Sequence, residues 1–199
     1  MCIRDSYLMA GMLAWSLFSE VMGRCLTVFI DNGNLLKKMA FPRLALPLIV
    51  TGSAVLTNLL LFAAILLVFG LLGHMPSIAI LWLPMLMLMT LALAIGIGLS
   101  LGVINVFMRD IGQVMPIVLQ FWFWLTPVVY TLQMFPEMNR EWFMLNPMTG
   151  VVMGYQSILV YGKAPDFSLL VYPVLLALGS ASLALFLYRR AGEDMADVL

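Results

Sequence analysis

The chain has 199 residues, of which 63% are hydrophobic and only 10% are charged. Soluble domains carry about a quarter charged residues, so this composition excludes an ordinary water-soluble fold and indicates that lipid surrounds much of the chain. The formal net charge is zero, which argues against a nucleic-acid partner because no basic stripe can neutralise phosphates. The single histidine, His74, cannot form a metal cluster, and two cysteines are too few for a disulfide framework. We predict an all-α polytopic membrane protein.

Residues 1–6 (MCIRDS) are polar and lack the apolar core of a signal peptide, so we expect a non-native or truncated start. The apolar run at residues 7–30 is long enough to span a hydrocarbon core of about 30 Å. Within it, Glu20 and Arg24 are spaced i,i+4 and can form an ion pair on one helix face. Charges inside a span face protein or water, so this intramembrane pair either joins two helices or lines a transport path.

A polar break at residues 31–43 (DNGNLLKKMAFPR) follows the first span. Its Asp-Asn-Gly-Asn start is typical of turns and helix caps, and the residues up to Pro42 can form a short basic amphipathic helix. The alternative is a loop whose only role is to orient the chain in the membrane.

An uncharged stretch extends from Leu44 to Met108, which is too long for one helix. Residues 73–76 (GHMP) supply a turn, so we predict two spans at residues 44–70 and 78–106. The second contains closely spaced small residues, which favour close helix–helix packing over a glycine-rich nucleotide loop. These residues are Gly96, Gly98, Ser100 and Gly102.

Arg109 and Asp110 precede a further span predicted at residues 112–131, which Pro127 should kink or end. We expect Asp110 to be the partner of Arg109 at the membrane edge. Consecutive aromatic residues cover most of this helix's circumference, so some must face lipid as an interfacial belt while others can face the interior. They are Phe121, Trp122, Phe123 and Trp124.

Residues 142–162 are uncharged, but Asn146-Pro147 and two glycines interrupt them. Irregular backbone at membrane depth survives only when it is buried in protein or lines water, so we predict a re-entrant helical hairpin here. The last span is predicted at residues 168–188, directly before Arg189-Arg190. The chain would thus have five transmembrane helices.

Five spans place most cationic side chains on one face of the membrane. Arg140 and Lys163 fall on the opposite face. Positive residues concentrate on cytoplasmic loops, so the first face is predicted to be cytoplasmic. The first span must then enter from outside, and we expect a preceding span that would give the parent protein six. The residues on the cytoplasmic face are Lys37, Lys38, Arg43, Arg109, Arg189 and Arg190.

Three segments, at residues 34–43, 105–130 and 145–162, resemble the permease subunit of ABC-2-type exporters. The resemblance is to the branch that exports lipid-linked polysaccharides such as O-antigen, teichoic acid or capsule. It extends over most of the chain from Tyr7 onward, in the family's order and spacing. The resemblance also leads us to expect that the family's amphipathic N-terminal interface helix and first span are missing from this sequence.

The resemblance implies a role for each segment. The break at residues 31–43 matches a cytoplasmic coupling helix that docks onto a separate ATPase subunit, through Lys37, Lys38, Phe41, Pro42 and Arg43. Arg109 and Asp110 match an intracellular corner. The aromatic span and the hairpin match the lining and outer gate of the translocation channel, with candidates Phe121, Trp122, Trp124, Tyr130, Asn146 and Pro147. It also implies a permease homodimer in the bacterial inner membrane, with ATP and Mg²⁺ held by the partner ATPase and no cofactor on this chain.

Other function classes remain open at this stage. The sequence lacks the Walker A pattern GxxxxGK[ST], so a separate subunit must supply ATP hydrolysis. An ABC-2 exporter of a drug or small lipid would share the same features. A membrane-embedded enzyme would have only Glu20 and the Arg109–Asp110 pair for its chemistry, and a secondary transporter would have Glu20 as its lone intramembrane carboxylate.

Overall fold

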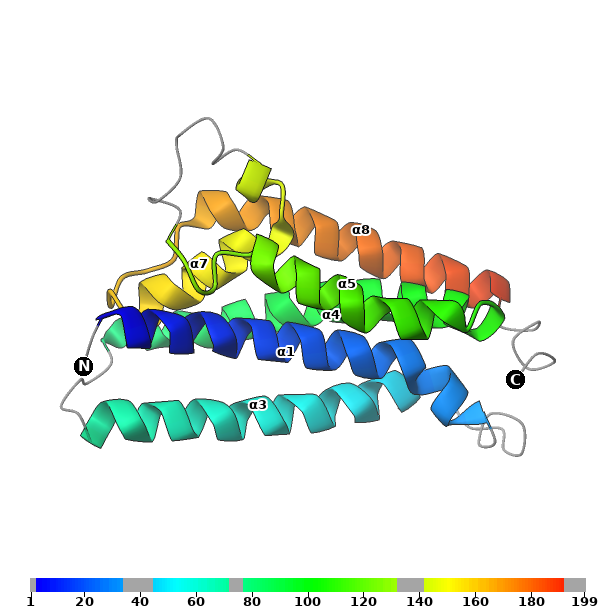
Figure 1. Ribbon diagram of the computed structural model, residues 1–199, viewed down its shortest axis with the longest axis horizontal. Coiled ribbons are helices and arrows are strands. Elements are labelled where there is room, and N and C mark those ends of the chain that lie inside the picture. Colours follow the sequence, from blue (N-terminus) through cyan, green and yellow to red (C-terminus); the bar gives the residue numbers. More distant parts are fainter. Residues whose placement is uncertain (1–2, 34–44, 72–76, 132–141, 192–199) are drawn as a thin grey trace.

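The computed structural model describes residues 3–33, 45–71, 77–131 and 142–191, and all regular structure in these ranges is helical (Figure 1). This confirms the predicted all-α class. The elements are α1 (Ile3–Asp31), α3 (Ala45–Leu71), the 3-10 helix η1 (Ile78–Trp82), α4 (Leu83–Phe107), α5 (Asp110–Leu125), α7 (Pro147–Leu159) and α8 (Phe167–Ala191).

Within the described ranges, four helical segments are long and apolar enough to cross a membrane. They coincide with the spans predicted at 7–30, 44–70, 78–106 and 168–188, so the chain is a multi-pass membrane protein. The segments are Asp5–Asp31, Pro47–Gly70, Ile78–Phe107 and Phe167–Arg190.

The helix in the span predicted at residues 112–131 is shorter than predicted, because it ends at Leu125. Helix α5 has 16 residues, which at 1.5 Å each gives about 24 Å, less than the hydrocarbon thickness of about 30 Å. It ends because Thr126 is extended (φ −99°, ψ 135°), as expected for a residue before proline. The prediction that Pro127 ends the helix is confirmed.

The region predicted as a hairpin, residues 142–162, contains a single helical turn at 142–144 and then α7. Helix α7 has 13 residues, about 20 Å, which is too short to cross the membrane alone. It ends before Gly162, whose positive φ of 62° reverses the chain toward α8. Most of α7 is buried, so it is an internal element of the bundle.

Helix α4 lies at the centre and packs closely on α1 through glycines. A β-carbon at Gly102 would lie 2.5 Å from the Cys25 carbonyl oxygen, and one at Gly98 would lie 2.8 Å from the Cys25 β-carbon. Gly96 similarly faces Ser180 of α8. The small residues of α4 therefore do what the sequence predicts, which is to bring helix backbones together.

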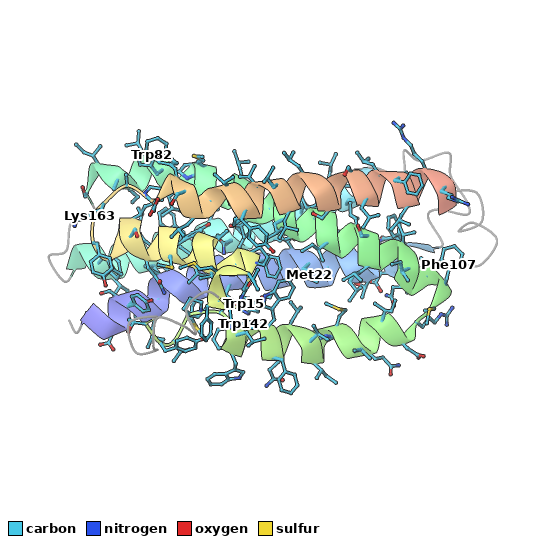
Figure 2. All side chains as sticks on the ribbon, turned by 90° about the horizontal axis from the view of Figure 1, so that it is seen from above. Trp15, Met22, Trp82, Phe107, Trp142 and Lys163 are labelled. Carbon is cyan, nitrogen blue, oxygen red and sulfur yellow. The ribbon has the colours of Figure 1, made fainter. Side chains whose placement is uncertain are left out.

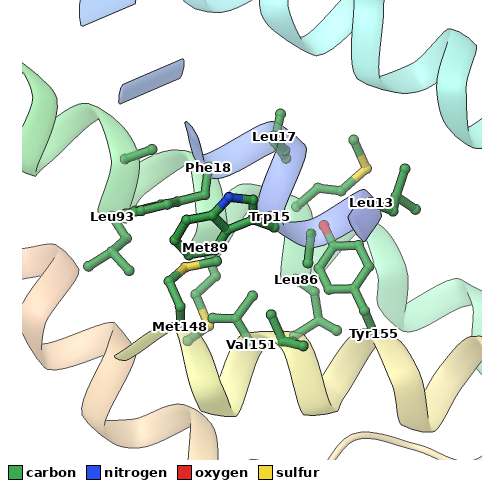
Figure 3. Close-up of a cluster of buried hydrophobic side chains, with 14 of the residues drawn as sticks. Leu13, Trp15, Leu17, Phe18, Leu86, Met89, Leu93, Met148, Val151 and Tyr155 are labelled. Carbon is green, nitrogen blue, oxygen red and sulfur yellow. The ribbon is translucent and has the colours of Figure 1, made fainter. Parts of the chain in front are cut away.

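The largest buried cluster lies where α1, α4 and α7 meet (Figure 3). It is built from aliphatic and aromatic side chains with a tyrosine at one end, and α7 supplies one of its walls. Its labelled members are Leu13, Trp15, Leu17, Phe18, Leu86, Met89, Leu93, Met148, Val151 and Tyr155. Because α7 contributes to this core, the α5–α7 region is held in the bundle from inside.

The two ends of the bundle differ in charge. Phe107, which precedes the α4–α5 corner, lies at one end and Lys163 lies at the other (Figure 2). Helix α1 ends, α3 begins and α8 ends at the same end as that corner (Figure 1). Arg109, Arg189 and Arg190 thus share one end, as the charge pattern predicts. The predicted coupling residues Lys37, Lys38, Phe41, Pro42 and Arg43, and also Arg140, lie outside the described residues.

Candidate functional site

Two of the four consecutive aromatic residues of α5 face the bundle interior. The Trp122 ring meets Phe18 of α1 edge to face with centroids 5.2 Å apart, and Trp15 at 6.4 Å. Phe123 meets Trp15 at 5.6 Å. Edge-to-face pairs of this kind contribute about 0.5–1.5 kcal/mol each beyond area burial. These four rings fasten α5 to α1.

The other two aromatic residues of the run face outward. Phe121 is 69% exposed and Trp124 is 60% exposed on the surface of this chain. A helix run of four cannot point all its side chains the same way, so the predicted division between interior and exterior is confirmed. The outward pair is available to lipid, to a second subunit or to a transported molecule.

Asn146 joins the end of α5 to the start of α7. Its Oδ1 accepts from the Trp122 indole Nε1 at 2.8 Å and from the backbone N–H of Met148 at 3.0 Å. Its Nδ2 donates to Thr126 Oγ1 at 2.8 Å and to the Leu125 carbonyl at 3.4 Å. Asn146 is thus the N-cap of α7 and also completes the C-terminus of α5.

Pro147 follows as the first residue of α7, where its missing N–H and fixed φ suit a helix start. The sequence pair Asn146-Pro147 was predicted as a break, and the structure shows that the break is a helix cap. Asn146 also accepts from the Trp122 indole, so these two members of the predicted channel set are in direct contact.

Tyr130, in the segment after α5, forms hydrogen bonds with both α5 and the beginning of α1. Its hydroxyl donates to the Trp124 carbonyl at 2.9 Å, while its own carbonyl accepts from the Tyr7 hydroxyl at 3.4 Å. Its ring also meets Phe143 with centroids 5.9 Å apart. The chain between Leu125 and residue 131 is therefore held by side chains although it is not helical.

Glu20 and Arg24 pair as their spacing predicts. Arg24 Nη2 donates to Glu20 Oε1 at 2.6 Å, and Arg24 Nη1 donates to Ser53 Oγ of α3 at 2.8 Å. The pair therefore links α1 to α3, which fits the joining role among the two alternatives. Both side chains remain partly exposed.

Arg109 and Asp110 form the corner between α4 and α5, and both are exposed. The structure records one ion pair within its described ranges, and that pair is Glu20–Arg24, so the expected bond between Arg109 and Asp110 is absent. Successive residues on a helix point in different directions, which explains the separation. Asp110 instead lies in the first turn of α5, where a negative charge complements the helix dipole.

The sequence reasoning missed Asn105, which is buried to 1% exposure at this corner. Its Nδ2 donates to the Leu26 carbonyl of α1 at 3.1 Å, and its Oδ1 accepts from the Gly112 N–H of α5 at 2.8 Å. A lone amide in the apolar span 78–106 was the available signal, because polar side chains within spans usually bind a specific partner.

Comparison with known proteins now identifies the family. Residues 3–160 match the family model described as ABC-2 type transporter. The chain belongs to the ABC-2 type transporter family. This confirms the family that the three sequence segments resemble, and the match extends over α1 to α7.

Curated relatives of this ABC-2 chain include three O-antigen export system permease proteins. The protein RfbA of Myxococcus xanthus is 30% identical over 166 residues, which is 80% of this chain and 62% of that protein. Two proteins of the same name from Klebsiella pneumoniae are 25% and 24% identical over 160 residues, each covering 78% of this chain and 61% of the relative. The chain thus spans less than two thirds of the length of these relatives.

The predicted site residues of this ABC-2 permease fall into three groups. Trp122, Tyr130, Asn146 and Pro147 contribute to the internal junction of α1, α5 and α7. Phe121 and Trp124 lie on the outer surface of α5. The remaining described candidates lie on α1 and at the α4–α5 corner, and they are Glu20, Arg24, Arg109 and Asp110.

Proposed function

We propose that this chain is the permease part of an ATP-driven exporter that moves a lipid-linked polysaccharide of the O-antigen type across the bacterial inner membrane. The observation that carries the proposal is the 30% identity, over 80% of the chain, to an O-antigen export system permease protein. The permease works as a homodimer with separate ATPase subunits that hold ATP and Mg²⁺. No catalytic role falls to this chain.

In the proposed topology the chain crosses the membrane five times. Helix α5 makes about 24 Å of the fourth crossing, and the segment of turns and bends from Thr126 to residue 131 completes it. Helix α7 then re-enters from the outer side and returns to Lys163. Two features support this path: α7 is buried against α1, and the hydrogen bonds of Asn146 satisfy backbone that lipid could not.

The end of the bundle that holds Arg109, Arg189 and Arg190 is proposed to be cytoplasmic, because cationic residues concentrate there. The break at residues 31–43 connects α1 and α3 at this end and serves as the coupling helix. ATP-driven closure of the ATPase subunits would push on this break and rock one permease copy against the other.

The outward aromatic residues of α5 are proposed to line the translocation path. Phe121 and Trp124 present flat apolar faces that can contact sugar rings without binding one residue tightly. A sliding polymer needs many weak contacts of this kind, as ions do in channels that bind them at several sites. Trp122 and Asn146, which lie behind this surface, hold α5 and α7 in position.

The test is co-purification and export with the full-length protein. We expect the full-length permease to bring down an ATPase subunit, and reversal of Lys37 and Lys38 to glutamate to weaken that association. In a host lacking its own exporter, the pair should restore surface polysaccharide only when the ATPase can hydrolyse ATP. Export of a drug or small lipid in place of polysaccharide would favour the other ABC-2 cargo class, and absence of any ATPase would reject the proposal.

Labelling from the outside provides a separate test of orientation. Cysteines introduced at Met108 and Lys163, both exposed at opposite ends of the bundle, should differ in reactivity toward an impermeant maleimide in intact cells. We expect labelling at position 163 and protection at position 108. Labelling at position 108 would place the α4–α5 corner outside and leave the ATPase no access to it.

A further inference from the structure

We propose that Asn105 is a positioning residue that ties α1 to the α4–α5 corner, so that motion at the 31–43 break reaches α5. The inference rests on the proposed function, because the motion it transmits is the one that an ATPase would impose. It is argued from three contacts at one end of the bundle.

The first contact joins α1 to α4. Gly102 of α4 lies against the Cys25 backbone and Gly98 lies against Cys25 and Met22, with no room for even a methyl group. Packing this close prevents α1 and α4 from sliding past each other without a change in backbone separation. A push at the end of α1 is therefore passed to α4.

The second contact is made by the Asn105 amide one turn further along α4. Its Nδ2 reaches across to the Leu26 carbonyl of α1, and this bond is buried. Because the side chain is only 1% exposed, an amide left without a partner there would be destabilising, so the bond favours a fixed separation between the two helices. Asn105 thus holds α4 at a fixed distance from the last turns of α1.

The third contact joins the same side chain to α5. Asn105 Oδ1 accepts from the Gly112 N–H, in the first turn of α5, at 2.8 Å. The residue at the formal N-cap, Arg109, makes no capping bond with its side chain. Asn105 takes over this role from the preceding helix, and a β-carbon at Gly112 would lie 3.1 Å from both amide heavy atoms.

One side chain therefore connects three helices at the end where the proposed coupling break begins (Figure 1). About three turns along α5, Trp122 packs again on Phe18 of α1. Helix α5 is thus attached to α1 at two levels, by an amide at the cytoplasmic end and by aromatic rings deeper in the membrane. Motion of α1 must turn or shift α5 and, with it, Phe121 and Trp124.

The experiment compares two buried asparagines in the full-length permease–ATPase complex in proteoliposomes. Asn58 is the matched control, because it is 2% exposed and its Nδ2 also donates to an α1 carbonyl, that of Leu13, at 3.3 Å. It lies on α3, away from the corner. Asn105→Leu and Asn58→Leu therefore each remove a buried amide that donates to α1, and only Asn105 lies at the α4–α5 corner.

The readout is the amount of polysaccharide exported per ATP hydrolysed. We expect Asn105→Leu to lower this ratio roughly five-fold or more, since coupling between sites usually changes an equilibrium by at least that factor. Asn58→Leu should leave the ratio unchanged. Asn105→Asp keeps an acceptor for Gly112 but loses the donor to Leu26, so we expect it to lower the ratio as well. An equal fall in Asn58→Leu, or normal coupling in Asn105→Asp, would overturn the proposal.

Hydrogen exchange separates this proposal from the proposed function. If the wild-type complex binds no ATPase or exports nothing, the proposed function fails. Even then, Asn105→Leu must speed exchange of the Gly112 amide, because Oδ1 no longer accepts there. Unchanged exchange at this amide, or the same increase in Asn58→Leu, would overturn the role of Asn105.

Discussion

Replacing Gly102 with alanine should separate α1 from α4 and destabilise the bundle. The added β-carbon would lie 2.5 Å from the Cys25 carbonyl oxygen, which is backbone and cannot rotate away. The neighbouring helix must therefore move. Inserting a carbon into a packed core costs about 1–3 kcal/mol, and the better helix propensity of alanine returns about 0.5–1 kcal/mol.

A matched substitution isolates the packing contribution. Gly52 lies on α3, and a β-carbon there would meet no atom within 4 Å. The helix-propensity gain is common to Gly102→Ala and Gly52→Ala, so their difference is the packing cost of about 1–3 kcal/mol. Gly52→Ala alone should be neutral or slightly stabilising.

Thermal unfolding of the two purified variants in the same detergent is the assay. A chain of this size shifts in Tm by about 2–4 °C per kcal/mol, so Gly102→Ala should unfold several degrees below Gly52→Ala. If the two variants unfold together, α1 and α4 have room that the structure does not show. The close backbone contact, and the rigid α1–α4 unit argued from it, would then be wrong.

Other side-chain contacts give three further predictions. Asn146→Leu should lower Tm more than Asn146→Asp, because the aspartate retains an oxygen to cap α7 and accept from Trp122; thermal unfolding checks this. Glu20→Gln should lower the amount of protein in the membrane more than the double variant Glu20→Gln/Arg24→Gln, because the single change leaves the Arg24 cation without its carboxylate. Immunoblots of membrane fractions measure these amounts. Trp122→Ala should lower stability by about 3–5 kcal/mol, whereas Trp124→Ala, with its ring exposed, should reduce export at nearly normal Tm.

Much of the fold could be predicted from the sequence because long apolar runs have few alternatives in lipid. The four spans recognised from hydropathy, and the end of α5 before Pro127, are found where they were predicted. Close packing at Gly98 and Gly102 was also predicted, since small residues in a span serve few other purposes. Each of these features depends on residues close together in the sequence, so local chemistry was sufficient to predict it.

The remaining features depend on long-range contacts that a sequence pattern does not encode. Nothing local distinguishes Trp122 from Trp124, yet one packs on α1 and the other is exposed. The pairing of Arg109 with Asp110 was wrong because adjacency in sequence was taken for contact. Asn105 was missed because its partners, Leu26 and Gly112, lie on two other helices.

The breaks in helical structure share one physical solution. Backbone groups released at membrane depth must find partners within the protein, because lipid offers none. At the α4–α5 corner that partner is Asn105, and beyond α5 the Leu125 carbonyl is met by Asn146. The Pro127 carbonyl accepts from the buried Nε2 of Gln156 at 3.1 Å. In an apolar sequence such as this, proline and glycine mark where helices break, while isolated amides are the residues that make the breaks stable. Substitution of Asn105, Asn146 or Gln156 should therefore alter the shape of the proposed translocation path while leaving the membrane-spanning helices intact.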